Sequence, residues 1–468
     1  MSQFNSVLRR DALQQFAGGF GGLALATMMS ESAEAAARPT VRTSDSVPKA
    51  KAVIQLFMHG GPSHVDLLDP KPMLNRFDGT APPEEVVDDE NRTNNLKGSP
   101  HRFRECGESG LAFSEIQPFV SRHADDIAVI RSMFTEHRNH EHAIWMAQTG
   151  LIVAGRPTLG SWITYGLGSE NRNLPSFVAL PDPGGLSVDG LRNWSSGWLP
   201  PQYQATVFRE QGSPVLHLEP TKPRPQDVTD ARLTLLSQLN KRHLANRPGE
   251  LELEARISTF EMAGRMQLAA TDALNLAQET RETQELYGIS HPTTKSYGTR
   301  CLMARRLVER GVRFVSIFMA GQPWDTHTHN DKKVKECCDR TDLPIGGLLT
   351  DLKRRGLLDS TLILWGGEFG RTPAAEIRKE NVPFGRDHHP YGFSVWMAGG
   401  GIKGGQSYGA TDDFGYRAVE NRTQTANLHA TILHLLGLNH ETLTYAHNGR
   451  DERLTDLYPA EVIKDVIA

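Results

Sequence analysis

Four short stretches of the 468-residue chain bring histidines together with carboxylates, arginines and glycines. They contain half of the 18 histidines: His59 and His64; His137, His140 and His142; His327 and His329; and His388 and His389. Imidazole is a common ligand of transition metals and titrates near neutral pH. The clustering therefore predicts a metal site or an acid–base site.

The clusters lie beside short apolar runs that are typical of buried strands. These predicted strands cover residues 53–58, 127–130, 314–318, 361–365 and 393–397. Helical patterns alternate with them, which predicts an α/β fold: a doubly wound, mostly parallel sheet with helices on both faces. Ligands of such sheets bind at the carboxyl ends of the strands. Polar segments follow four of the predicted strands, and a fifth precedes the last strand: 59–69, 135–142, 324–329, 366–372 and 387–389. We therefore expect all five to meet at one edge.

Carboxylates and imidazoles at this edge could hold one or two divalent cations. The predicted metal ligands are Asp66, Asp325, His327, His329, Glu368 and His388. The mixture suits Zn²⁺ best, with Mn²⁺, Fe²⁺ or Ca²⁺ as alternatives. A single histidine after a strand is more often structural than a ligand, so the prediction depends on several clusters occurring together.

His140 and Arg371 are the candidate catalytic residues, and Asn139, Arg386 and His389 are candidates for substrate binding. A guanidinium can bind an anionic group bidentately. His140 is expected to open a helix, where it could act as a covalent nucleophile, a metal ligand or a general acid; we favour ligand or acid–base chemistry. Such a site is suited to metal-assisted attack on a phosphate or sulfate ester.

Residues 1–37 have the pattern of an export signal. Arg9-Arg10 precedes an apolar run over 16–29 and small residues at 33 and 35, which indicates the twin-arginine route and a periplasmic or extracellular location. Residues 38–49 are expected to form a linker, and residues 50–468 one domain with excursions at 78–110 and 181–225. No other apolar run could span a membrane, so no span is expected after cleavage.

The overall composition excludes other classes of protein. The net charge is −4, with no basic stripe that would indicate nucleic-acid binding. Four cysteines are too few for a disulfide scaffold.

The order of these segments resembles the alkaline phosphatase superfamily, which includes sulfatases and cofactor-independent phosphoglycerate mutases. Asp325 and His329 have the family's Asp-x-x-x-His spacing, and residues 366–370 match its Asp-His-Gly region with Glu368 in place of aspartate. His388 matches the late histidine of the family.

The sequence is more similar to a branch of that superfamily, exported bacterial proteins often labelled sulfatase-like. The matching motifs cover residues 60–66, 69–72, 139–140, 324–327, 367–373, 385–388, 398–405 and 449–456. The resemblance extends over residues 50–465. The Asp-x-His spacing of the branch favours His327 as a ligand, whereas the spacing of the superfamily favours His329.

The sequence also departs from the superfamily. His59 stands where the first strand is followed by an aspartate, and His140 stands where related enzymes carry a hydroxyl nucleophile. The sulfatase signature is absent, because Cys301 has Arg305 four residues later but Met303 in place of proline. The resemblance implies an exported metal-dependent hydrolase of phosphate or sulfate esters without a formylglycine nucleophile. The alternative is a catalytically degenerate member that binds metal and anionic glycans, sulfated or phosphorylated.

Overall fold

The computed structural model describes residues 47–83, 93–212, 215, 225–247, 250–376, 382–456 and 458–468. The predicted export signal and most of the predicted linker lie outside these residues, as do 84–92, 213–214 and 216–224 of the predicted excursions. None of the described helices combines the length and apolar character needed to cross a bilayer.

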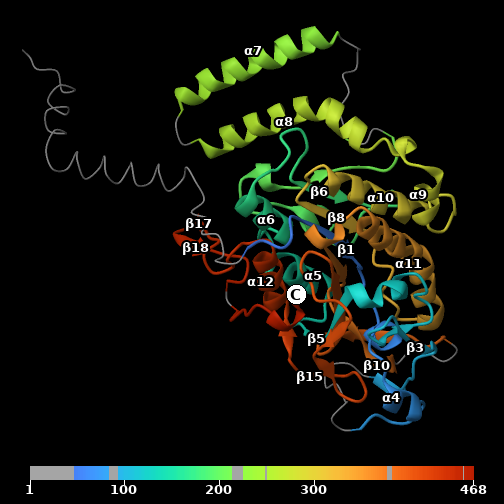
Figure 1. The fold of residues 1–468 in the computed structure, drawn as a ribbon. Helices are drawn as coiled ribbons and strands as arrows, with labels where there is room; N and C mark the ends of the chain where they lie inside the picture. The colour runs from blue at the N-terminus through green and yellow to red at the C-terminus, as the bar shows by residue number, and fades with distance from the viewer. Residues whose placement is uncertain are drawn as a thin grey trace, which may run out of the picture.

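A nine-stranded sheet forms the centre of the chain (Figure 1). Its order is β13-β5-β12-β9-β1-β8-β6-β7, and β16 also pairs with β5. The strands are β1 (Ala52–Phe57), β5 (Ile127–Phe134), β6 (Phe177–Leu180), β7 (Thr206–Val207), β8 (Phe314–Phe318), β9 (Thr361–Gly366), β12 (Phe393–Ala398), β13 (Gln406–Tyr408) and β16 (Thr423–Gln424). All pairings are parallel except those of β12, which runs antiparallel to both β5 and β9.

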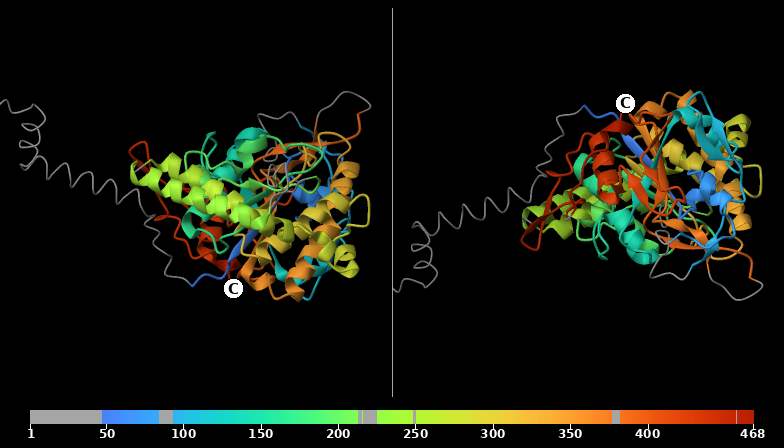
Figure 2. Two further views of the ribbon diagram at one scale, coloured as in Figure 1. Left: turned by 90° about the horizontal axis from the view of Figure 1, so that it is seen from above. Right: turned by 90° about the horizontal axis from the view of Figure 1, so that it is seen from below.

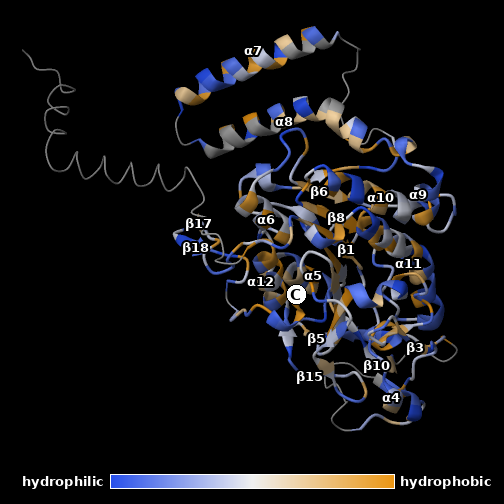
Figure 3. Cartoon of the chain, in the orientation of Figure 1, coloured by the Kyte–Doolittle hydropathy of each residue, from blue (hydrophilic) through white to orange (hydrophobic). Residues whose placement is uncertain are grey.

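Helices cover both faces of this sheet, because its strands are apolar on both sides. In β1, Ile54 and Leu56 belong to the core shared with α10 (Lys295–Glu309) and α11 (Asn330–Arg354). Val53 and Phe57 belong to the opposite core, shared with α6 (Leu159–Leu167) and α12 (Thr425–Leu435). The views in Figure 2 show helices on either side of the sheet, and Figure 3 shows apolar residues concentrated in the central strands. The predicted α/β fold with a mostly parallel, doubly covered sheet is confirmed.

The direction of β12 decides where the polar clusters meet. The loops after β1, β8 and β9 leave the sheet at the carboxyl ends of parallel strands. Since β12 is antiparallel to β9, its first residue lies at that same edge. The segment 386–389, which precedes β12, therefore reaches the edge where the other clusters lie.

Smaller elements surround the sheet. A three-stranded sheet of β2 (Thr93–Leu96), β10 (Gly370–Glu376) and β11 (Arg386–His389) lies beside the polar edge. α7 (Gln226–Ala245) and α8 (Leu251–Ala273) form a helical hairpin on the outside of the molecule (Figure 1). The remaining elements are α3 (His64–Leu67), α4 (Pro72–Arg76), β3 (Phe103–Cys106), β4 (Leu111–Ser114), α5 (His140–Thr149), α9 (Arg281–Leu286), β14 (Ala410–Thr411), β15 (Ala418–Glu420), β17 (Tyr445–His447) and β18 (Arg450–Glu452), with short 3₁₀ turns between them.

His429 on α12 predicts how stability depends on pH. The side chain is buried and its Nε2 atom contacts the Ala147 carbonyl at 2.9 Å; burial lowers the pKa of His429 to about 4. The unfolded chain therefore binds this proton first as the pH falls below about 6.5. We expect His429 to reduce the free energy of unfolding by up to about 1.4 kcal/mol per pH unit between pH 6.5 and 4.

Urea denaturation at several pH values in that range tests this expectation. His429→Gln should flatten the dependence, whereas His243→Gln, at an exposed position of α7, should leave it unchanged. An equal slope in the wild type and His429→Gln would contradict the assignment.

Candidate metal centre

Three imidazoles surround one carboxylate oxygen at the polar edge of the sheet. Asp325, in the loop after β8, has its Oδ1 atom 2.9 Å from Nε2 of His327, 3.2 Å from Nε2 of His388 and 3.5 Å from Nε2 of His140. We call these four residues the Asp325 cluster. His140 opens α5 and His388 lies on β11, so the cluster joins elements that are far apart in the sequence.

Each imidazole is also held from behind through its Nδ1 atom. Nδ1 of His140 contacts Glu368 Oε1 at 2.7 Å, and Nδ1 of His327 contacts Glu376 Oε2 at 2.7 Å. Nδ1 of His388 faces the main-chain oxygen of Arg138 at 2.8 Å. All three partners are acceptors, so each Nδ1 atom carries a proton and donates it.

This arrangement fits a bound divalent cation. With Nδ1 protonated, a neutral imidazole directs the lone pair of Nε2 inward, and here that means toward Asp325 Oδ1. The Nε2 atoms of His327 and His388 lie only 2.9 Å apart, and the buried Nε2 of His140 has no hydrogen-bond partner among the described residues. Lone pairs facing one another and a carboxylate repel unless a positive charge, either a metal ion or a proton on Nε2, lies between them. Burial opposes protonation of His140 and His327, but the contact of each with Asp325 outweighs it and raises the pKa of both imidazoles. Metal-bound histidines commonly have this outer carboxylate or carbonyl partner.

Two overlapping groups of ligand atoms are close enough to share an ion. His140, Asp325 and His388 form one group, and His327, Asp387 and His388 form the other, with the ligand atoms of each within 4.8 Å of one another. They have His388 in common. The geometry is therefore compatible with one ion in the Asp325 cluster, with Asp387 at its margin.

The charges in the cluster are strongly coupled. Burial opposes ionisation of Asp325, but the contacts with the three imidazoles and the charge of Arg371 outweigh it and hold the pKa of this carboxyl well below its usual range. Burial, the Arg371 charge and His140 lower the pKa of His388, despite its contact with Asp325. A neutral His388 has the lone pair that a metal ligand requires.

Arg371 positions this cluster from within the protein. Its guanidinium is fully buried and donates to Asp325 Oδ1 at 2.5 Å, to the Gly61 carbonyl at 3.1 Å, to the Arg386 carbonyl at 3.2 Å and to the Gly60 carbonyl. Gly60 has a φ of 111°, and a Cβ atom there would lie 2.4 Å from the Asp325 nitrogen. Close approach of the two loops therefore requires glycine, and Arg371 fixes both loops.

Asp66 and Arg386 lie together but outside the Asp325 cluster. Arg386 donates from Nε to Asp66 Oδ2 at 2.8 Å and from Nη2 to Oδ1 at 3.1 Å, and both side chains are fully buried. The Ser63 hydroxyl and the Asn330 amide also donate to Asp66 Oδ2, at 2.6 and 2.8 Å. This pair connects the loop after β1 with β11, so Asp66, a predicted metal ligand, and Arg386, a predicted substrate-binding residue, pair with each other and lie apart from Asp325.

Three further predicted site residues also lie outside the cluster. Asn139 caps α5 by accepting from the Glu141 N–H at 3.0 Å. His329 is exposed at the N-terminus of α11, with a φ of 55°. His389 is buried and contacts the Tyr416 carbonyl. Of the two alternatives His327 and His329, the structure brings only His327 to Asp325.

Two acidic residues of the site are absent from the predicted set. Glu376 ends β10 and holds His327, while Asp387 Oδ1 accepts from the His388 N–H at 2.7 Å and lies 3.7 Å from Nδ1 of His327. Asp387 has a signal in the sequence, since it directly precedes His388. Glu376 has none, because its role depends on the way the β10–β11 hairpin folds back toward the loop after β8.

No hydroxyl or thiol of the described residues contacts the Asp325 carboxylate; its described partners are the three imidazoles, Arg371 and Gln322, whose amide donates to Oδ2 at 2.9 Å. Cys301 lies in α10, fully buried, and burial raises the pKa of its thiol. Cys301 is therefore poorly suited to act as a nucleophile, in agreement with the missing sulfatase signature.

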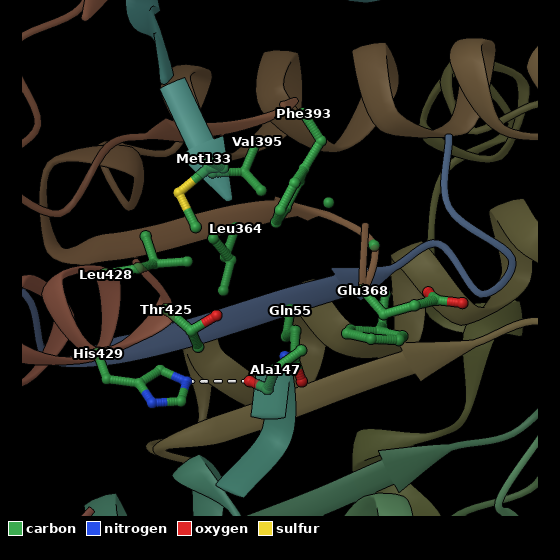
Figure 4. A pocket seen from close by; sticks show the side chains of 13 residues that line it. Gln55, Met133, Ala147, Leu364, Glu368, Phe393, Val395, Thr425, Leu428 and His429 are labelled. Carbon is green, nitrogen blue, oxygen red and sulfur yellow. Dashed lines mark hydrogen bonds between the residues drawn. The ribbon is translucent and has the colours of Figure 1, made fainter. Parts of the chain in front are cut away.

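A separate cavity lies next to Glu368, between the sheet and α12. Its volume is about 30 Å³, and its lining includes Phe57, Leu364, Val395 and Leu428. Figure 4 shows that the Glu368 carboxylate points away from Leu364, Val395 and Leu428. A pocket for a sugar-sized ligand needs roughly 300 Å³ or more. This cavity is therefore too small to be the substrate site.

The buried contacts of Arg371 predict a large effect on stability. Arg371→Lys keeps the charge but leaves at least two buried carbonyls without a donor, so we expect it to reduce the free energy of unfolding by about 2–4 kcal/mol. Arg417→Lys, at an exposed arginine, is the matched control and should change it by less than about 0.5 kcal/mol. Both are measured by urea denaturation. If Arg371→Lys were as stable as the control, Arg371 would not have this structural role.

Comparison with known proteins places the chain in a family. No curated protein matches it. Similar solved structures include the PsFucS1 sulfatase from Pseudoalteromonas sp. (13% identity, 93% of this chain and 79% of that one, TM-score 0.35). Others are the TAB5 alkaline phosphatase (10%, 84% and 100%, TM-score 0.35) and the phosphonate monoester hydrolase of Agrobacterium radiobacter (12%, 84% and 74%, TM-score 0.34). Similarity at this level assigns neither a reaction nor a substrate. The family described as "Protein of unknown function (DUF1501)" matches residues 50–467, and the chain therefore belongs to it.

Proposed function

We propose that the chain is an exported hydrolase of phosphate or sulfate esters that depends on one divalent metal ion. The ligands are His140, Asp325, His327 and His388. The observation that supports this most directly is the convergence of three Nε2 atoms on Asp325 Oδ1, each imidazole being held through Nδ1. Export is inferred from the sequence pattern of residues 1–37.

The donor set favours particular metals. Three imidazole nitrogens and one carboxylate oxygen suit Zn²⁺, and Mn²⁺ or Fe²⁺ accept the same ligands. Ca²⁺ is a poor fit because it prefers six to eight oxygen ligands. When bound, the cation would polarise an ester oxygen and lower the pKa of a water molecule.

The residues of this chain then have distinct roles. Glu368 and Glu376 fix the tautomers and orientations of His140 and His327. Arg371 donates to Asp325, which favours the ionised carboxylate and fixes its position. The side chains of Asp325, His140, His327 and His388 are 11–23% exposed, so an ester can approach the cluster from solvent. We assign His140, one of the two candidate catalytic residues, as a metal ligand. The nucleophile in this proposal is a water molecule and not a side chain.

The choice of ester substrates is based on the motif resemblance to the alkaline phosphatase superfamily described above. The alternative is a member that binds metal and an anionic glycan without turnover. No hydroxyl of the described residues contacts the Asp325 carboxylate, which is compatible with both the hydrolase and the binding protein. Turnover therefore has to be measured.

Metal content tests the ligand assignment. We expect the purified wild type to contain about one equivalent of divalent metal per chain. His327→Ala removes one inward-facing nitrogen and should lose most of this metal. His329→Ala, two residues away and exposed, is the matched control and should retain it.

Metal is measured by elemental analysis, with circular dichroism as the check on folding. Full metal occupancy in a folded His327→Ala variant, or equal loss from both variants, would contradict the proposed ligand set.

Ester turnover tests the reaction. The metal-loaded protein should hydrolyse a nitrophenyl phosphate or sulfate, a chelator should abolish the activity, and added metal should restore it. Cys301→Ala should leave turnover within about twofold of the wild type, because this buried thiol takes no part in the reaction. A metal-loaded, folded protein with no turnover of either ester would refute the hydrolase proposal and favour the binding alternative.

A further inference from the structure

One helix of the molecule has apolar side chains on two opposite faces. α7 packs against α8, and α8 in turn packs against α10 and the 3₁₀ turn Pro201–Tyr203. Figure 1 shows α7 on the outside of the molecule, with α8 between it and the rest of the chain. A surface helix normally has one apolar face, so a second apolar face indicates a second packing partner.

The inner face of α7 is the one that contacts α8. Four half-buried residues recur on it at intervals of three or four positions: Leu233, Ser237, Asn240 and Leu244. Leu233 packs against Gly264 of α8, where an added Cβ atom would lie 2.8 Å from the Leu233 Cδ2 atom. The contact with α8 therefore accounts for one side of the helix only.

The outer face of α7 carries a second set of apolar residues. Val228, Leu235 and Leu239 are 43%, 56% and 50% exposed, and at about 3.6 residues per turn they align on the side opposite Leu233. Leu236, which is 49% exposed, borders them. We call Val228, Leu235, Leu236 and Leu239 the outer row. Single exposed leucines are common on protein surfaces, but a row of them along one helix is typical of a contact surface.

The charges beside the outer row differ between the two ends of the helix. Asp227 lies at its start, whereas Lys241 and Arg242 lie near its end; all three are exposed, and none forms an ion pair with a described residue. Asp227 and Arg242 are about four turns apart, which places them on the same flank of the outer row. Leu235 lies midway between them.

A second copy of the same helix, running in the opposite direction, matches this pattern. A twofold axis at Leu235 places this leucine against its own copy and brings Asp227 of each chain level with Arg242 of the other. The same flank of both helices lies on one side of such an antiparallel pair, so each acid meets a base. A parallel pair would instead bring acid against acid and base against base.

We propose that the outer row is the interface of an antiparallel homodimer with two Asp227–Arg242 ion pairs across it. α7 has 20 residues and is therefore about 30 Å long. A contact between single helices is at the small end of protein interfaces, so we expect a dimer that dissociates with a Kd of about 10 µM. The inference does not depend on the proposed function.

Sedimentation velocity of the full chain at several concentrations and low ionic strength tests the interface. We expect the wild type to change from monomer to dimer over about 1–100 µM. Leu235→Glu brings two like charges together at the twofold axis and should raise the Kd at least about tenfold. Leu191→Glu, at a leucine that is 64% exposed outside α7, is the matched control and should leave the Kd unchanged. Circular dichroism checks the folding of each variant.

Charge reversal tests the direction of pairing. Asp227→Arg and Arg242→Asp, each alone, replace two attractive contacts by two repulsive ones and should raise the Kd about fivefold. The double variant restores opposite charges at both ends and should return the Kd to within about twofold of the wild type. Weakening in both single variants without recovery in the double variant would overturn the antiparallel arrangement.

Three other results would overturn the dimer itself. The first is a wild type that stays monomeric at about 100 µM, and the second is a dimer that Leu235→Glu leaves unchanged. The third is a monomer that binds vesicles of anionic phospholipid and loses this binding in Leu235→Glu, because the outer row would then face a membrane surface.

Discussion

The geometry of the polar edge depends on a single oxygen atom, Oδ1 of Asp325. Three imidazole nitrogens and one guanidinium approach it, and they come from α5, the loop after β8, β10 and β11. The ionised carboxylate accepts from the Arg371 guanidinium, and its ionisation is favoured in turn by that charge and by the contacts with the imidazoles. The elements around it are positioned so that none can shift without disturbing the others.

The arginines of the site show how burial decides their role. Arg371 and Arg386 were candidates for catalysis and substrate binding, yet each is fully buried and uses its guanidinium on main-chain carbonyls and a carboxylate. A buried guanidinium with five donors is expensive to leave unpaired, so it becomes a connector between loops. Through hydrogen bonds, these two arginines connect β10 and β11 to the loops that follow β1 and β8.

Much of the fold was accessible from the sequence. The five predicted strands correspond to β1, β5, β8, β9 and β12, because continuous apolar runs between helical patterns are a strong signal for a buried sheet. The four-residue strand β6 gave too short a signal. α11 runs from Asn330 to Arg354 with Pro344 in its interior, and a proline inside a helical pattern is normally a signal for a helix boundary.

The site was accessible in part. The residue types and their places after strands indicated His140, Asp325, His327 and His388, which the structure does bring together. It could not be seen from spacing that Glu368 holds a histidine from behind, that Asp66 pairs with Arg386, or that His389 turns toward the loop at Tyr416. Each of these depends on which face of a strand or loop is turned inward. That direction is set by contacts between segments hundreds of residues apart.

The position of β5 has a consequence for how the chain folds. Its partners in the sheet are β12, β13 and β16, all of which come after residue 392. A chain emerging from the ribosome therefore carries β5 as an apolar strand with two open edges until almost the whole domain has been synthesised. Such edges invite pairing with other chains, and contacts of this sequence separation form slowly. The same late segment includes β11 and His388, so the Asp325 cluster cannot be assembled on a nascent chain that ends before His388.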